Sequence, residues 1–263
     1  MISILATVYP SIIQILVLTV LLILCVRLLI NNKESKPAVF LTFTFALSLF
    51  SDIYWLVYDF LRPDVRMPFA ANEFGEVGLF LMFAATINTA IPHGSHCARK
   101  QTIGVILFMI SNIALWILWS GEWLQDILIG AIFTWLVYSA VCSLKVVRAL
   151  KKPEWILLGI YCFILIAGQA CTFLVAEQFK QIVDVGCYIL LCIAQIYWLI
   201  KLVLAYKNKS SPETLLSLAA SNVIWSSISL YMSEGTIYTV FMMIGTLSFI
   251  FMYLAVRKVV NRS

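Results

Sequence analysis

Nine long apolar runs follow one another along this chain, and they constrain the fold more than any other feature. Each run is long enough to cross a bilayer, whose hydrocarbon core takes about 20 residues of helix. Only helices and closed barrels cross lipid, because lipid offers no partner to backbone N–H and C=O groups. Barrel strands alternate apolar and polar residues, which these runs do not. The predicted helical spans are residues 9–30, 39–60, 72–91, 102–119, 123–144, 155–175, 182–200, 214–232 and 236–256.

The composition agrees with a membrane protein. Hydrophobic residues make up 62% of the 263 residues and charged residues 12%, whereas a soluble domain has about 25% charged residues. So few charges cannot cover a surface that faces water. We therefore expect one integral membrane domain over residues 1–263, folded as an all-α polytopic bundle of about nine spans, with eight spans as the main alternative.

Several partners and cofactors are not expected. The basic residues are scattered between the apolar runs, which predicts no nucleic-acid partner and leaves membrane lipid as the expected one. His93 and His96, followed by Cys97, have no further ligand nearby in the sequence, so we predict no metal site. No motif predicts another cofactor.

Loop charges predict the orientation. All but three of the 18 Lys and Arg residues, the exceptions being Arg62, Arg66 and Lys180, fall on the side where the odd-numbered spans end. The positive-inside rule places that side in the cytoplasm. The expected protein lies in a bacterial cell membrane, with its N-terminus outside and its C-terminus in the cytoplasm.

Short similarities suggest an internal repeat. Ser111-Asn112 matches Ser221-Asn222, and Glu76-Val77-Gly78 is similar to Asp184-Val185-Gly186. An even number of spans per unit would give both copies the same orientation. The sequence therefore allows one helix followed by two parallel four-helix repeats, with chance similarity between apolar helices as the alternative.

Carboxylates within the apolar runs are the main candidates for function, because a charge near the bilayer centre costs about 2.5–3.5 kcal/mol. Asp52 lies roughly 12 Å from the outer end of its run. Glu73 and Glu76 are one helical turn apart and share a face, while Asp126 and Asp184 begin two later runs on the same side. These residues could line an acidic cavity that opens outward between spans 2, 3, 5 and 7. Glu73, Asp126 and Asp184 also lie in first helical turns, where the helix dipole alone favours an acid.

Aromatic and amide side chains complete the predicted ligand site. Tyr54, Trp55 and Trp116 beside carboxylates would suit a cationic group, although the aromatic belt at membrane interfaces is an alternative explanation. Asn112 and Asn222 are polar residues in mid-span, where interhelical hydrogen bonding is the default role. Glycines are expected to permit close helix packing at four positions: Gly75, Gly78, Gly130 and Gly245.

Ser51-Asp52 in one span, followed by Phe-Ala-Ala-Asn-Glu-Phe-Gly-Glu at residues 69–76, resembles the YhhN-type lysoplasmalogenase family. These polytopic enzymes cleave the vinyl-ether bond of lysoplasmalogens. The resemblance covers about 40 residues and implies Asp52 and Glu76 as general acid and base. The family leads one to expect eight spans rather than nine, and a polar residue of another type at position 76.

Three functions therefore stay open. The first is a transporter or ligand-binding protein whose outward cavity accepts a proton or a cationic or amphiphilic small molecule. The second is an intramembrane hydrolase of lipid-like substrates that uses Asp52 and Glu76, and the third is a sensory or accessory subunit. Two carboxylates that face each other in a cavity open to lipid would favour the hydrolase. A polar path past Asn112 and Asn222 to the cytoplasm would favour transport.

Overall fold

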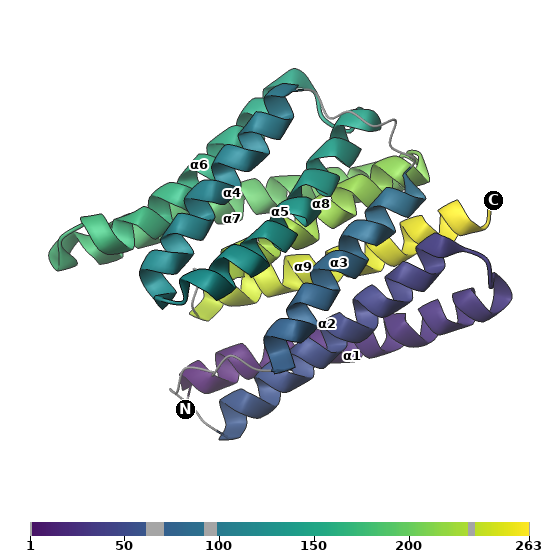
Figure 1. The fold of residues 1–263 in the computed structure, drawn as a ribbon, viewed down its shortest axis with the longest axis horizontal. Helices are drawn as coiled ribbons and strands as arrows, with labels where there is room; N and C mark the ends of the chain where they lie inside the picture. Colours follow the sequence, from purple (N-terminus) through teal and green to yellow (C-terminus); the bar gives the residue numbers. More distant parts are fainter. Residues whose placement is uncertain (1, 62–70, 92–98, 231–234, 263) are drawn as a thin grey trace.

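The structure is a computed structural model that describes residues 2–61, 71–91, 99–230 and 235–262. Within these ranges the chain forms nine α-helices joined by short connections (Figure 1). Their bounds are α1 Ile2–Asn31, α2 Lys36–Leu61, α3 Ala71–Ala90, α4 Arg99–Ser120, α5 Trp123–Val146, α6 Lys152–Leu174, α7 Glu177–Lys207, α8 Pro212–Leu230 and α9 Gly235–Val260. The prediction of an all-α bundle of about nine helices is confirmed.

Seven of the described helices are long and apolar enough to cross a membrane, namely α1, α2, α4, α5, α6, α7 and α9. Their outer faces carry large apolar side chains such as Leu118, Phe163 and Ile193, which are more than half exposed. Apolar surface of this extent is unfavourable in water and favourable in lipid. The chain is therefore a polytopic helical membrane protein.

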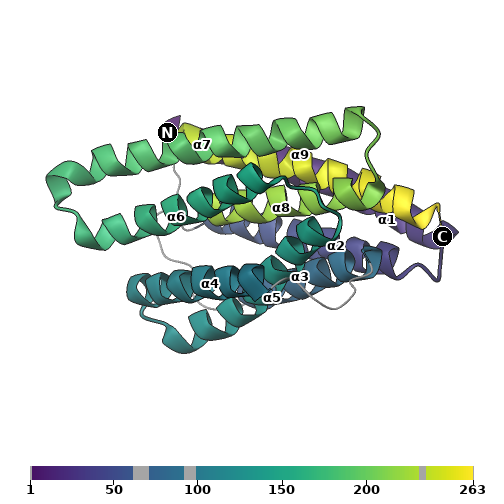
Figure 2. The same cartoon turned by 90° about the horizontal axis from the view of Figure 1, so that it is seen from above.

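Helix α8 differs from those seven because it lies inside the bundle. It packs against α3, α5, α7 and α9, and Figure 2 shows it between the α7–α9 side and the α4–α5 side. Every residue from Leu215 to Ser226 is buried. A helix that lipid does not touch can carry polar side chains if neighbouring helices bond them, which explains the lower hydropathy of α8.

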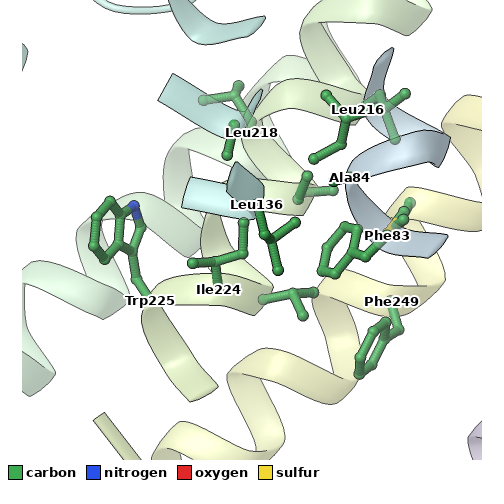
Figure 3. Packing of buried hydrophobic residues seen from close by; sticks show 14 of the residues in the cluster. Phe83, Ala84, Leu136, Leu216, Leu218, Ile224, Trp225 and Phe249 are labelled. Carbon is green, nitrogen blue, oxygen red and sulfur yellow. The ribbon is translucent and has the colours of Figure 1, made fainter. Parts of the chain in front are cut away.

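The core surrounds α8. Figure 3 shows Phe83 and Ala84 of α3, Leu136 of α5 and Phe249 of α9 converging on the side chains of α8, among them Leu216. A T-shaped ring contact between Phe45 and Phe249, with centroids 5.7 Å apart, extends the core to α2. The core thus fixes α2 and α9 side by side, which matters for the site below.

The two ends of the chain lie at opposite ends of the bundle (Figure 1), as an odd number of crossings requires. The end that holds the C-terminus of α9 also holds the connections α1–α2, α5–α6 and α7–α8. The basic residues of these connections are therefore gathered at one end of the molecule. That this end is cytoplasmic stays a prediction.

Helix contacts agree in part with a four-helix repeat. Helices α2–α3, α3–α5 and α4–α5 are in contact, and so are the corresponding pairs α6–α7, α7–α9 and α8–α9. However, α7 also packs on α8, whereas α3 and α4 share no contact of comparable extent. The repeat stays a prediction.

Candidate functional site

Asp52 occupies the most unusual position among the predicted site residues. It lies in α2, nine residues before the helix ends at Leu61, which corresponds to about 14 Å of helix. Its side chain hydrogen-bonds to Gln14 of α1. The Oδ2 atom is buried and has no hydrogen-bond partner in the described part of the chain. Asp52 is thus a carboxylate at membrane depth with only part of its bonding capacity used.

Gln14 ties Asp52 to a third helix. Its Oε1 accepts a hydrogen bond from Thr246 Oγ1 of α9 at 2.9 Å. Because the amide oxygen is engaged there, the amide N–H is the group that donates to Asp52. Gln14 and Thr246 are both buried. We call these three residues the Asp52 cluster, and it joins α1, α2 and α9.

Asp52 and Glu76 lie on different faces of the neighbouring helices α2 and α3. A Cβ on Gly75 would lie 3.3 Å from the Phe50 ring, so Phe50 points at α3. Asp52 follows Phe50 by two residues, about 200° around the helix, and its partner Gln14 belongs to α1. Glu76 is one turn before Phe80, whose ring packs on Phe133 of α5 at 4.8 Å. The hydrogen bond to Gln14 therefore directs Asp52 towards α1, while helix periodicity places Glu76 on the face of α3 from which Phe80 contacts α5.

The aromatic residues next to Asp52 form no cage in the described structure. Tyr54 is half-buried, and its ring lies 6.5 Å from the ring of Tyr58, one turn further along α2. Trp55 is 42% exposed on the outside of the bundle. These positions fit an aromatic belt at the edge of the membrane better than a ligand-binding cage.

Asn112 and Trp116 lie elsewhere. The Oδ1 of Asn112 accepts a hydrogen bond from Gln169 Nε2 of α6 at 3.1 Å, so the interhelical hydrogen bond predicted for Asn112 is confirmed. Trp116, one turn later, packs on Phe133 of α5. Helix α4 packs against α5 and α6 and makes no extensive contact with α2. Asn112 and Asp52 therefore do not share a site.

The two later carboxylates are also separate from Asp52. Asp126 lies in the first turn of α5, where the helix dipole favours an acid, and it accepts a hydrogen bond from Ser120 at the end of α4. Asp184 is half-buried near the start of α7. The main contacts of α2 are with α1, α3 and α9, those of α5 with α3, α4 and α8, and those of α7 with α6, α8 and α9. The described helices thus do not bring Asp52, Asp126 and Asp184 into one acidic cavity.

Asn222 belongs to a second buried polar cluster. Its Nδ2 donates to the backbone oxygen of Trp198 in α7 at 3.3 Å. Gln195 Nε2, also from α7, donates to the Asn222 backbone oxygen at 3.3 Å and to Ser226 Oγ at 2.7 Å. All four residues are buried. This set is called the Asn222 cluster, and it confirms the interhelical bonding predicted for Asn222.

The two clusters adjoin different faces of one segment of α9. A Cβ on Gly245 would lie 3.5 Å from the Ser226 Cβ, so this glycine allows α8 and α9 to approach closely. The next residue, Thr246, lies about 100° further around α9 and bonds to Gln14. Gly245 and Thr246 thus place the Asn222 cluster and the Asp52 cluster beside the same turn of α9. The predictions for Gly75, Gly78 and Gly130 are confirmed in the same way, by close approach of Phe50, Leu47 and Ile113.

Some predicted positions lie outside the described residues. They are His93, His96 and Cys97 in the connection between α3 and α4, and Arg62 and Arg66 between α2 and α3. The backbone of Glu73 belongs to α3, but its side chain is not among those described.

Four residues of the two clusters escaped the sequence interpretation, namely Gln14, Gln195, Trp198 and Thr246. A signal for two of them was present, since each glutamine is a side-chain amide within an otherwise apolar span. Such an amide must find a partner inside the bundle. The sequence does not tell which helix supplies it.

The fold and these clusters define the class of protein, a polytopic helical membrane protein with buried polar groups between its helices. Comparison of the chain with known protein families, with curated proteins and with solved structures finds no match.

Proposed function

We propose that this membrane protein binds a proton or a small metal cation at the Asp52 carboxylate, and that this binding serves transport across the membrane. The observation that carries the proposal is the buried Oδ2 atom of Asp52, which lacks a hydrogen-bond partner in the described chain. The side chain of Asp52 does hydrogen-bond to Gln14, but Gln14 is neutral and does not balance the charge of the carboxylate. A bare charge at this depth costs about 2.5–3.5 kcal/mol or more. A proton or a cation on the carboxylate removes that cost.

The surroundings of Asp52 favour a small ligand. Oδ2 is buried, and the side chains of Ser51 and of Ser48, one turn before Asp52, are buried as well. A proton or a metal ion can reach such an atom through small fluctuations of the packing. A bulky amine or an amphiphile needs a cavity, and the aromatic side chains that would form one around its cationic group lie elsewhere.

Transport is favoured over hydrolysis by the direction of the polar groups. The Asp52 cluster and the Asn222 cluster adjoin the same turn of α9, which supports a route through the bundle. A lysoplasmalogenase-like reaction needs Asp52 and Glu76 to act on one substrate, and their directions towards α1 and α5 give that pairing no support.

Labelling with a hydrophobic carbodiimide tests the proposal, because this reagent enters lipid and reacts with protonated carboxyl groups. We expect mass spectrometry of the purified protein to find the adduct at Asp52, with a yield that falls as the pH rises. Sodium, lithium or potassium chloride should lower the yield further if a metal ion binds, with choline chloride as the control salt. Asp126→Asn is the matched control variant, and it should leave the Asp52 adduct unchanged.

Flux in proteoliposomes then separates transport from binding. An enclosed pH-sensitive dye and an imposed membrane potential report proton movement, and a sodium-sensitive dye reports that ion. We expect Asp52→Asn to insert normally and to reduce flux to the level of protein-free liposomes. An Asp52 that takes no adduct at any pH, or an Asp52→Asn variant with wild-type flux, would refute the proposal.

A further inference from the structure

A small cavity lies between α5, α6, α7 and α8, away from Asp52. Its wall includes Leu150, Leu158, Trp198, Ser221, Asn222 and Trp225. Its volume is about 10 Å³, close to the space that a single water molecule needs. Most of the wall is apolar, so the few polar atoms on it decide what it can hold.

Two of the residues in this wall carry buried polar atoms without a partner. They are the indole Nε1 of Trp198 and the side-chain Oδ1 of Asn222, and neither has a hydrogen bond in the described part of the chain. The first is only a donor and the second is only an acceptor. A water molecule is the smallest group that can accept from one and donate to the other.

A third polar group is available in the same wall. The Ser221 hydroxyl donates to the Ser217 backbone oxygen at 2.8 Å, which leaves its own oxygen able to accept. Buried waters in proteins typically make about three hydrogen bonds to groups that would otherwise be unsatisfied. Trp198, Asn222 and Ser221 supply that number.

We propose that this cavity is a binding site for one water molecule, held between the Trp198 indole N–H and the Asn222 side-chain oxygen, with the Glu154–Lys201 ion pair closing the cavity towards the nearest aqueous end. The water accepts a hydrogen bond from Trp198 and donates one to Asn222 Oδ1. It completes the bonding of the Asn222 cluster.

The closure follows from positions along α6 and α7. Glu154 precedes the wall residue Leu158 by one turn of α6, and Lys201 follows the wall residue Trp198 by nearly one turn of α7. Glu154 and Lys201 form an ion pair, and Tyr197 donates a hydrogen bond to Glu154 Oε1 at 3.1 Å. The Lys201 ammonium also lies 5.9 Å from the centre of the Trp198 ring. These contacts hold α6 and α7 together between the cavity and the bulk water.

X-ray footprinting in reconstituted vesicles tests the site, because an X-ray pulse converts a bound water into a hydroxyl radical that oxidises its neighbours. We expect Trp198 to be oxidised although it is buried, whereas Tyr161 and Phe241, which are at least as buried and lie outside the cavity wall, stay protected relative to their intrinsic reactivity. Asn222→Leu should lower Trp198 oxidation several-fold and leave the exposed Trp119 unchanged. Trp198 oxidation as low as that of Phe241, or unchanged in Asn222→Leu, would overturn the proposal.

Folding and closure have separate readouts. If Asn222→Leu fails the thermal unfolding check, Trp198→Phe replaces it, with Trp225 oxidation as the signal and the same expected loss. For the closure, a pulse of heavy-oxygen water before irradiation should label the Trp198 product faster in Glu154→Gln than in the control Glu34→Gln. Equal labelling rates would overturn the closure by the ion pair.

These outcomes do not depend on Asp52. Carbodiimide labelling of Asp52 tests the proposed function, while Trp198 oxidation tests the water site. A failure of either experiment therefore leaves the other conclusion to stand on its own result.

Discussion

Gly130 offers the sharpest test of the packing between α4 and α5. It is buried in α5 against Ile113 of α4. A Cβ on Gly130 would lie 2.6 Å from Ile113 Cδ1, closer still to Cγ1, and 3.6 Å from Cβ. Carbon atoms at rest are about 3.5–4.0 Å apart, so Gly130→Ala requires a movement of about 1 Å between two packed helices.

The expected magnitude follows from two opposing effects. Overpacking of this kind costs about 1–3 kcal/mol. The replacement of glycine within a helix contributes up to about 1 kcal/mol in the opposite sense. We therefore expect Gly130→Ala to lower the free energy of unfolding by about 1–2 kcal/mol.

A compensating change identifies the cause. Ile113→Ala removes Cγ1 and Cδ1 and leaves only the Cβ at an ordinary contact distance of 3.6 Å. In the Ile113→Ala background, Gly130→Ala should cost nothing, so the two changes couple favourably by about 1–2 kcal/mol. Ile113→Val should rescue poorly, because valine keeps a branch at the Cγ1 position.

Reversible unfolding in mixed micelles, followed by circular dichroism, measures these differences. Gly104→Ala on α4 is the matched control, because a Cβ there meets no atom within 4 Å; it should leave stability unchanged or raise it slightly. A Gly130→Ala protein as stable as Gly104→Ala, or an Ile113→Ala change that gives no rescue, would contradict the close contact between Gly130 and Ile113.

Three further outcomes are expected. Gln195→Leu should lower the free energy of unfolding by about 1–3 kcal/mol, because it removes the donor to Ser226 in a fully buried position. Tyr161→Phe should cost about 0.5–1.5 kcal/mol through loss of the 2.7 Å hydrogen bond between the hydroxyl groups of Tyr161 and Ser229, measured by the same unfolding assay. Lys201→Met and Glu154→Gln should couple by about 1 kcal/mol in a double-mutant cycle, and additive losses would show that the ion pair does not stabilise the α6–α7 contact.

The apolar runs were sufficient to predict the helices but not their ends. Helix α7 begins at Glu177 and ends at Lys207, whereas the predicted span covers residues 182–200. Hydrophobicity reports only the part of a helix that lies in hydrocarbon, and a helix continues into the interface where polar residues are equally acceptable. This is why the charged ends of α7 were missed.

The sequence predicts that polar residues in mid-span bond between helices, but it does not predict which residues they bond to. Asn112 and Asn222 were expected to bond between helices, and they do. Their partners Gln169 and Trp198 depend on which helices are neighbours, and a hydrophobic pattern contains no such information. Asp52 and Glu76 lie on consecutive helices, yet their positions on those helices face different sides, because packing sets how each helix is rotated.

The outward cavity between spans 2, 3, 5 and 7 was inferred from the common side of the acids. That inference assumes that acids on the same side of the membrane also lie close to one another. Helix α8 takes the centre of the bundle and contacts α3, α5, α7 and α9, while α2 packs on the outside of α3 and α9. The burial of α8 from Leu215 to Ser226 shows only when the helices are placed together.

Infrared difference spectroscopy of the reconstituted protein, recorded between a low and a high pH, tests the role of Asp52 most directly. The account predicts a carbonyl band of a protonated carboxyl group in an apolar surrounding, which is absent in Asp52→Asn and displaced in Gln14→Leu because the hydrogen bond from Gln14 is lost. A band that is identical in all three proteins, or one at the frequency of a carboxyl group in water, would contradict it.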